Sequence, residues 1–259
     1  MEYEASLNKY KIVIAYDGTN YGGWQVQKNA VSIQSLIERS LSRILRAKTS
    51  LCGSGRTDAG VHSLGQTAHF VTEASIPPSR ILFSLNGLLP PDIRILSIER
   101  VPLEFHARYS ATSKVYHYHL HLDSVPDPFK HLYSYHVPHP VDIELLKQIV
   151  KFFIGTHDFS SFANEGHQGS AARNAVRTID RIDIVEEPGG VRLEFEGNGF
   201  LYKMVRNIVG TLLDVCAGKI PKEAIPAIFA AKDRRKAGRA APPHGLYLME
   251  VKYEEKEEK

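Results

Sequence analysis

The chain has 259 residues, 43% of them hydrophobic and 24% charged, which is an ordinary mix for a globular protein with a substantial core. No apolar run approaches the roughly 20 residues that span a bilayer, and the acidic start is unlike a secretory signal, so we expect a cytoplasmic protein with no membrane partner. The net charge of +3 is too small to identify a nucleic-acid partner, and the two cysteines, Cys52 and Cys216, suggest neither a disulfide scaffold nor a cysteine zinc site.

The first half of the chain alternates strand and helix patterns. Ser32 is a plausible N-cap for the first helix, and Pro90-Pro91 ends the second. The expected elements are strands over 10–16, 49–52, 66–72 and 93–101, and helices from Ile33 to Leu45 and from Pro77 to Pro90. This β-α-β-β-α-β order is typical of the ferredoxin-like split unit, an antiparallel sheet with its helices on one side.

A glycine-rich loop, residues 53–62, lies between two of these strands. Its glycines let the backbone turn sharply and let another molecule approach closely. Asp58 follows Arg56 by two residues, and an adjacent guanidinium favours the ionised carboxylate. Such an Asp can accept hydrogen bonds or act as a nucleophile. The alternative is that Asp58 only bonds the backbone of its own turn.

The second half repeats this plan. The expected elements are strands over 114–122, 176–186, 191–196 and 246–253, a helix capped by Asp142 and closed by Gly155, and a long helix from Phe200 to Cys216. We therefore expect an α+β protein with two similar ferredoxin-like halves, residues 1–103 and 104–259, the second ending in an acidic tail. Their antiparallel sheets are expected to meet at a central cleft, because clefts between domains are common ligand sites.

Alternating residues divide the strand over 114–122 into two faces. Tyr116 and Tyr118 lie on one face, and His117, His119 and His121 point the other way. Three histidines on one face invite a metal interpretation, but alternate side chains stand about 7 Å apart, which is awkward for a single ion. A solvated or RNA-facing strand surface is the favoured alternative. Tyr116 by itself is interpreted as a packed aromatic residue.

Polar residues on the long helix also share a face. Lys203, Arg206, Asn207 and Gly210 recur at spacings of three and four, opposite the apolar stripe. Such a face is usually solvated. Further on, residues 232–239 carry five bases and one acid, the kind of electrostatic footprint that RNA binding needs. A solvated surface loop is the alternative there as well.

Four stretches together resemble the TruA-type tRNA pseudouridine synthases. They are residues 55–62 (Gly-Arg-Thr-Asp-Ala-Gly-Val-His), the pair Phe105-His106-Ala107-Arg108 and Tyr116-His117-Tyr118, and residues 204–210 (Met-Val-Arg-Asn-Ile-Val-Gly). The resemblance extends in order from about Lys11 to Tyr253 and is weakest over 160–175, a polar stretch that we expect to be a mobile loop closing on RNA. It implies that Asp58 is the catalytic nucleophile, that Tyr116 contacts the target base, and that Arg206 pairs with the catalytic Asp.

The resemblance further implies an isomerase that converts uridine to pseudouridine at positions 38, 39 and 40 of the tRNA anticodon stem-loop and works as a homodimer. The reaction needs no cofactor and no metal, and the chain has neither a dinucleotide fingerprint nor a P-loop. The expected cleft would then bind RNA, with Arg56 and Arg206 around Asp58. Phosphate contacts are expected from the bases of the 232–239 loop, which are Lys232, Arg234, Arg235, Lys236 and Arg239.

Two other functions are compatible with parts of the sequence. A catalytically silent RNA-binding module could use the same scaffold, although the full set of Arg56, Asp58, Tyr116 and Arg206 argues against it. A metal-dependent hydrolase could use the three histidines of the 114–122 strand. Activity lost in Asp58→Asn would exclude the first, and activity retained in chelator would exclude the second.

Overall fold

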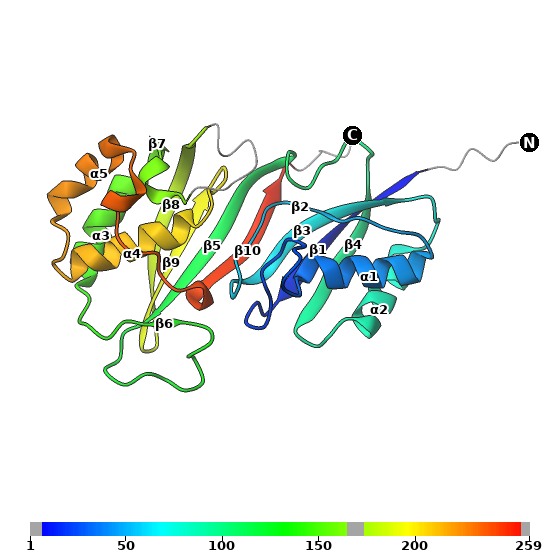
Figure 1. Cartoon of the computed structure of the whole chain (residues 1–259), viewed down its shortest axis with the longest axis horizontal. Helices are drawn as coiled ribbons and strands as arrows, with labels where there is room; N and C mark the ends of the chain where they lie inside the picture. The colour runs from blue at the N-terminus through cyan, green and yellow to red at the C-terminus, as the bar shows by residue number, and fades with distance from the viewer. Residues whose placement is uncertain (1–6, 165–173, 255–259) are drawn as a thin grey trace, which may run out of the picture. The chain divides into compact units, whose positions relative to one another are not determined.

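A computed structural model describes residues 7–164 and 174–254, and its contacts divide the chain into two compact units (Figure 1). Unit 1 is formed by residues 1–112 and 248–259, and unit 2 by residues 113–247. The predicted acidic tail and the centre of the predicted 160–175 loop lie outside the described residues. The predicted division into one α+β domain over residues 1–103 and another over residues 104–259 stays a prediction.

Unit 1 is a sheet with two helices, in which β1 pairs antiparallel with β3 and with β4. Its elements are β1 (Asn8–Tyr16), α1 (Ile33–Leu45), β2 (Cys52–Gly53), β3 (His62–Thr72), α2 (Pro78–Leu88), β4 (Ile93–Val101) and most of β10 (Leu246–Tyr253). The strand order is β4-β1-β3-β10, and β2 pairs with β3. Ile12 lies in register with Ala68 of β3 and with Ile98 of β4.

The core of unit 1 follows from the period of two along β1. Tyr10, Ile12, Ile14 and Tyr16 are all buried, and they belong to one apolar cluster with side chains of α1 and α2. Ser32 caps α1 as predicted, because its side chain accepts the backbone N–H of Ser35 while the Ser35 hydroxyl lies near the Ser32 N–H.

Unit 2 is also a sheet with helices, joined by short 3-10 turns. Its elements are β5 (Ala111–His121), β6 (Tyr135–His136), α3 (Ile143–Ile149), η1 (Val150–Phe153), β7 (Gly155–Asp158), η2 (Ser160–Phe162), β8 (Val176–Glu187), β9 (Gly190–Gly197), α4 (Met204–Cys216), η4 (Lys222–Ala224), α5 (Ile225–Ala231), η5 (Arg234–Lys236) and η6 (Pro243–Gly245). The strand order is β5-β9-β8-β7, and β6 pairs with β5. The chain is therefore an α+β protein.

The long helix of unit 2 begins later than predicted. It starts at Met204 instead of Phe200, because Lys203 adopts a left-handed backbone conformation with φ of 60° and the preceding Gly199 has φ of 157°. Neither conformation continues a right-handed helix. Over residues 7–164 and 174–254, no helix is long and apolar enough to cross a membrane.

Candidate active site

The glycine-rich loop over 53–62, called the Asp58 loop below, joins β2 to β3 in unit 1. Hydrogen bonds fix Thr57, the residue before Asp58. Thr57 is buried, whereas Asp58 is half-buried and Arg56 is exposed. The Thr57 hydroxyl shares a hydrogen bond of 2.8 Å with the Tyr16 hydroxyl, and the Thr57 carbonyl accepts the Trp24 N–H at 3.1 Å. The carboxylate therefore follows a residue that is fixed by both its side chain and its backbone.

A second set of hydrogen bonds fixes the beginning of the loop. The Ser54 N–H donates to the Thr67 carbonyl at 2.7 Å, and the Ser54 hydroxyl donates to Gln66 Oε1 at 2.7 Å. Gln66 Nε2 in turn donates to the Gly55 carbonyl at 3.1 Å. Because Ser54 and Gln66 are buried, these bonds face little competition from water.

Gly23 lets the segment that carries Trp24 approach the loop closely. It adopts φ of 91°, and a Cβ atom at this position would lie 2.5 Å from the Thr57 carbonyl oxygen. Any other residue would be strained and would also collide with the loop. The sequence requires glycine here so that Trp24 can hold Thr57.

Tyr116 lies on the predicted apolar face of β5 in unit 2. Its partner across the strand pair is Phe195, while His117 and His119 on the other face lie opposite Glu194 and Arg192. The Tyr116 ring is 8% exposed and packs edge-on against the Phe200 ring, with the ring centres 5.1 Å apart. The period-two prediction for this strand is confirmed, and Phe200 is a neighbour that the sequence did not indicate.

Arg206 lies on α4, also in unit 2, and is half-buried. Its Nε donates to the Ala241 carbonyl at 2.7 Å, and the Ala241 N–H donates back to the Arg206 carbonyl at 2.9 Å. This pair of bonds joins the helix to the segment that follows the basic loop, residues 232–239. The Nη atoms of the same guanidinium are donors of the kind that bind an anion.

The polar face of α4 is packed instead of solvated. Asn207 is fully buried and donates to the Phe162 carbonyl at 2.8 Å. Gly210 is buried as well, and a Cβ atom there would lie 1.6 Å from the Arg239 carbonyl oxygen. The segment that contains Arg239 therefore runs directly against the helix, and these two positions are not solvated, although a polar helix face usually is.

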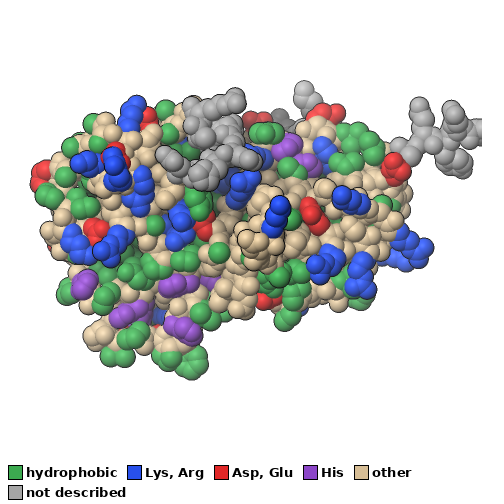
Figure 2. Space-filling model, in the orientation of Figure 1, with side chains coloured by type: hydrophobic (Ala, Val, Ile, Leu, Met, Phe, Trp, Pro, Cys, Tyr) green, Lys and Arg blue, Asp and Glu red, His purple; other side chains and the backbone are tan. Residues whose placement is uncertain are grey.

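The bases of the 232–239 loop fall into three groups. Lys232 and Arg235 each form an ion pair of 2.8 Å, with Asp158 and Asp233 respectively. Arg234 is half-buried, donates to Asn207 Oδ1 at 2.7 Å, and has a buried Nε with no hydrogen-bond partner among the described residues. The side chains of Lys236 and Arg239 are exposed. Figure 2 shows Lys and Arg side chains spread over the face of unit 2 that carries α4 and α5.

The predicted catalytic residues thus occur as two sets. Arg56 and Asp58 lie together on the loop of unit 1, and Tyr116 and Arg206 belong to unit 2. In unit 1, hydrogen bonds fix the loop that carries Arg56 and Asp58. In unit 2, Tyr116 lies on the paired strand β5, and Arg206 is hydrogen-bonded to Ala241. The gathering of all four at one site is part of the proposal below.

The three histidines of β5 do not converge on a common point. His119 Nδ1 lies 2.9 Å from Glu187, His117 Nε2 lies 3.7 Å from Glu194, and His121 Nε2 lies 3.9 Å from Asp123. Each imidazole has a different carboxylate neighbour, so the arrangement resembles separate imidazole–carboxylate pairs more than a metal site. The hydrolase alternative gains no support from these contacts.

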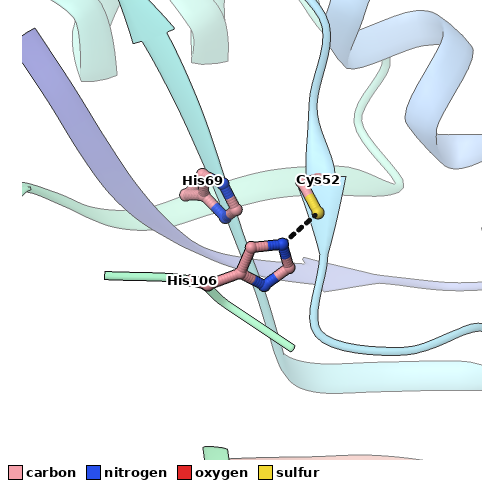
Figure 3. A group of neighbouring side chains, drawn as sticks. All are labelled: Cys52, His69 and His106. Carbon is pink, nitrogen blue, oxygen red and sulfur yellow. Dashed lines mark hydrogen bonds between the residues drawn. The ribbon is translucent and has the colours of Figure 1, made fainter. Parts of the chain in front are cut away.

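A different group in unit 1 brings metal-binding residue types together. Cys52, His69 and His106 come from distant parts of the sequence, and one potential ligand atom of each lies within 4.8 Å of the others (Figure 3). His106 Nε2 lies 3.6 Å from the Cys52 sulfur. No pattern in the sequence indicated this group, because the three residues share no short motif.

Hydrogen bonds to the two imidazoles disfavour metal binding at this group. The Ala107 N–H donates to His69 Nδ1 at 3.1 Å, and the Arg108 and Tyr109 N–H groups donate to His106 Nδ1 at 3.2 and 3.3 Å. An accepting Nδ1 leaves the proton of a neutral ring on Nε2, whereas a ring that binds metal through Nε2 carries its proton on Nδ1. Burial also raises the pKa of the Cys52 thiol. In this group, the N–H at Nε2 of the His106 imidazole donates a hydrogen bond to the Cys52 sulfur.

Comparison with known proteins identifies the family. A family model described as tRNA pseudouridine synthase matches residues 12–110 and 149–254. The chain therefore belongs to the tRNA pseudouridine synthase family, a class of isomerases.

Relatives of similar length carry more particular names. The chain is 58% identical over 249 residues to tRNA pseudouridine synthase A 1 of Protochlamydia amoebophila, covering 96% of this chain and 97% of that one. It is 45% identical over 247 residues to tRNA pseudouridine synthase A of Acetivibrio thermocellus, covering 95% and 100%. It is 46% identical over 243 residues to the protein of that name in Chlamydia muridarum, covering 93% and 90%.

Proposed function

We propose that the chain converts uridine to pseudouridine at positions 38, 39 and 40 of the tRNA anticodon stem-loop, with Asp58 as the nucleophile. The observation that carries this proposal is the Asp58 loop, whose half-buried carboxylate follows the fixed Thr57. A carboxylate that must reach one atom of a substrate benefits from such support, because reactive geometry is lost with small displacements.

The reaction is a rearrangement within one nucleotide. The N1–C1′ bond of uridine breaks, the uracil turns, and a C5–C1′ bond forms. The proton on C5 leaves, and N1 gains one, so no atom is added overall. Asp58 attacks either the ribose or the base, which permits cleavage of the N1–C1′ bond. The bond from Asp58 to the nucleotide then breaks, either when C5 displaces the carboxylate from C1′ or by elimination from the base, and the free carboxylate is restored. Arg56 and Arg206 stabilise its negative charge, and Tyr116 packs on the uracil and assists removal of the C5 proton.

The target nucleotide must leave its stack to reach Asp58. Extrusion costs a few kcal/mol. Stacking of the base on Tyr116 would offset about 1–3 kcal/mol of that cost. The proposal therefore requires the four side chains to line one cleft that admits a flipped nucleotide. Bases of the 232–239 loop would contact phosphates and position the RNA without reading its sequence.

The substrate positions are tested with unmodified tRNA transcripts that carry a single anticodon-stem uridine at 38, 39 or 40. We expect the protein to form pseudouridine in each transcript, detected as a carbodiimide-dependent stop of reverse transcription. A transcript with no uridine at these positions is the control. Modification only outside the anticodon arm would contradict the proposed substrate.

We also propose that the enzyme is a cytoplasmic homodimer, as the resemblance implies. Sedimentation velocity at micromolar concentration should give a dimer, and fractionation of cells should recover the protein with the tRNA. A monomer that is fully active at saturating tRNA would contradict the oligomeric part of this proposal.

A further inference from the structure

A buried polar cluster in unit 1, formed by the side chains of Tyr16 and Gln66, is hydrogen-bonded to the Asp58 loop. Tyr16 ends β1, is 4% exposed, and shares its hydrogen bond with the Thr57 hydroxyl. Burial raises the pKa of Tyr16 to about 12, although the neighbouring side chains of Thr57, Gln66 and Ser63 oppose that shift. The phenol is therefore protonated at neutral pH and acts as a fixed hydrogen-bonding group.

Polar residues in this position are not needed for a stable core. Two other inward residues of the strand, Ile12 and Ile14, are apolar, and the Tyr16 ring already packs near Trp24 with ring centres 6.2 Å apart. Burying hydroxyl groups costs free energy unless each one finds a partner. Where all partners are present, such a network fixes one geometry in preference to similar ones.

The bonds of this cluster end on the loop itself. Tyr16 holds Thr57, and Gln66, which is fully buried, holds Ser54 and Gly55. Of the four residues that precede Asp58, three are thus hydrogen-bonded to these two buried side chains. We propose that Tyr16, through Thr57, is a positioning residue that fixes Asp58 for the reaction. This inference rests on the proposed role of Asp58.

The test compares two variants that remove a buried hydroxyl from the same strand. Tyr16→Phe removes the contact to the loop. Tyr10→Phe is the matched control, because Tyr10 is also fully buried on β1 but donates to the Ile76 carbonyl at 2.9 Å, in another part of the unit. In assays over a range of tRNA concentrations up to saturation, we expect Tyr16→Phe to lower kcat about tenfold with KM within twofold, and Tyr10→Phe to leave both unchanged.

Variants of Thr57 examine the same hydrogen bond from its other end. Thr57→Ser keeps the hydroxyl and should retain most of the kcat, whereas Thr57→Val should lose about as much as Tyr16→Phe. The double variant Tyr16→Phe/Thr57→Val should be no slower than the slower single variant, because both changes remove one interaction. Thermal unfolding of every variant checks that the assayed protein is folded.

Equal kcat values in Tyr16→Phe and Tyr10→Phe would overturn the inference. A rise in KM alone in Tyr16→Phe, or a loss in Thr57→Ser as large as in Thr57→Val, would also overturn it. If the wild-type protein forms no pseudouridine, the proposed function itself has failed. If Asp58→Asn is inactive but Tyr16→Phe is unaffected, only the positioning role is wrong.

Discussion

The loop around Asp58 shows how single residues fix the position of a carboxylate. Thr57 is tied to Tyr16 and to the backbone of Trp24, and Gly23 makes room for that contact. None of these side chains gains or loses a proton near neutral pH, so none of them can act as an acid or a base there. Their contribution is geometric, and it leaves Asp58 half-buried on a supported turn.

His69 makes a residue-scale prediction about acid stability. Burial lowers its pKa to about 4, and the ordinary value for histidine in an unfolded chain is about 6.5. The unfolded chain therefore binds more protons between these two values. The stability that the neutral ring contributes is complete above about pH 6.5 and is lost as the pH falls toward 4.

We expect His69→Asn to reduce this acid sensitivity, because the Asn oxygen can accept the Ala107 N–H without becoming protonated. The free energy of unfolding in urea, measured at pH 7.0, 5.5 and 4.5, should fall less steeply in the variant, by up to about 2 kcal/mol over the range. His139→Asn, at an exposed histidine, is the control and should keep the wild-type slope. The same slope in all three proteins would contradict this account.

At the scale of elements, the contact between α4 and the segment around Arg239 holds Arg206 in place. The Ala241 carbonyl accepts the Arg206 Nε at 2.7 Å, and the close approach at Gly210 allows that contact. The helix α4 and the segment after the 232–239 loop are therefore packed and hydrogen-bonded to each other. A substitution at Gly210 should displace the Arg206 guanidinium indirectly, by moving this segment.

Two glycine variants test this contact. Gly210→Ala would place Cβ 1.6 Å from the Arg239 carbonyl oxygen, and we expect it to lower the free energy of unfolding by about 1–3 kcal/mol and to lower kcat further. Gly87→Ala on α2 is the control, because, among the described residues, no atom outside the adjacent turns of the helix lies within 4 Å of the added Cβ. That change should raise stability by about 0.5–1 kcal/mol. Equal effects of the two variants would contradict the proposed contact.

The elements that the sequence predicted best are those with local signals. Ser32 and the apolar stripe defined α1 at both ends, and the final strand was predicted with its observed bounds. The start of α4 was missed because Lys203, a residue with no turn preference, takes a left-handed conformation. The short strand before the Asp58 loop was also overestimated, since only Cys52–Gly53 pair with β3.

The parts of the site that depend on distant contacts could not be predicted. Residues 55–62 pointed to Asp58, but the partner of Thr57 is 41 positions away in the sequence. The burial of Asn207 and Gly210 follows from the return of the 234–241 segment, which no periodic pattern encodes. The group formed by Cys52, His69 and His106 likewise appears only when the chain folds.

At the scale of the whole molecule, RNA binding should depend on charges that can meet phosphates. Lys236 and Arg239 are exposed, whereas Lys232 and Arg235 already pair with carboxylates. We expect Lys236→Gln/Arg239→Gln to raise KM for tRNA and to flatten its dependence on salt, by a slope of about 0.7–0.9 for each phosphate that the variant no longer neutralises. Folding should be unchanged.

The control for this charge change is Lys147→Gln. Lys147 lies on α3 and pairs with Glu144 at 2.8 Å, so its replacement removes a charge of unit 2 that does not belong to the 232–239 loop. The salt dependence of KM, measured from about 50 to 300 mM potassium chloride, should stay at the wild-type value in this variant. An unchanged slope in the double loop variant would mean that the loop faces away from the RNA.

The most direct test of the account is a single-turnover assay of pseudouridine formation with Asp58→Asn. The amide keeps the shape of the side chain but is no nucleophile, so we expect the rate to fall by at least about a thousandfold while tRNA binding is retained. A folded Asp58→Asn protein that forms pseudouridine within about tenfold of the wild-type rate would contradict the central role given to this carboxylate.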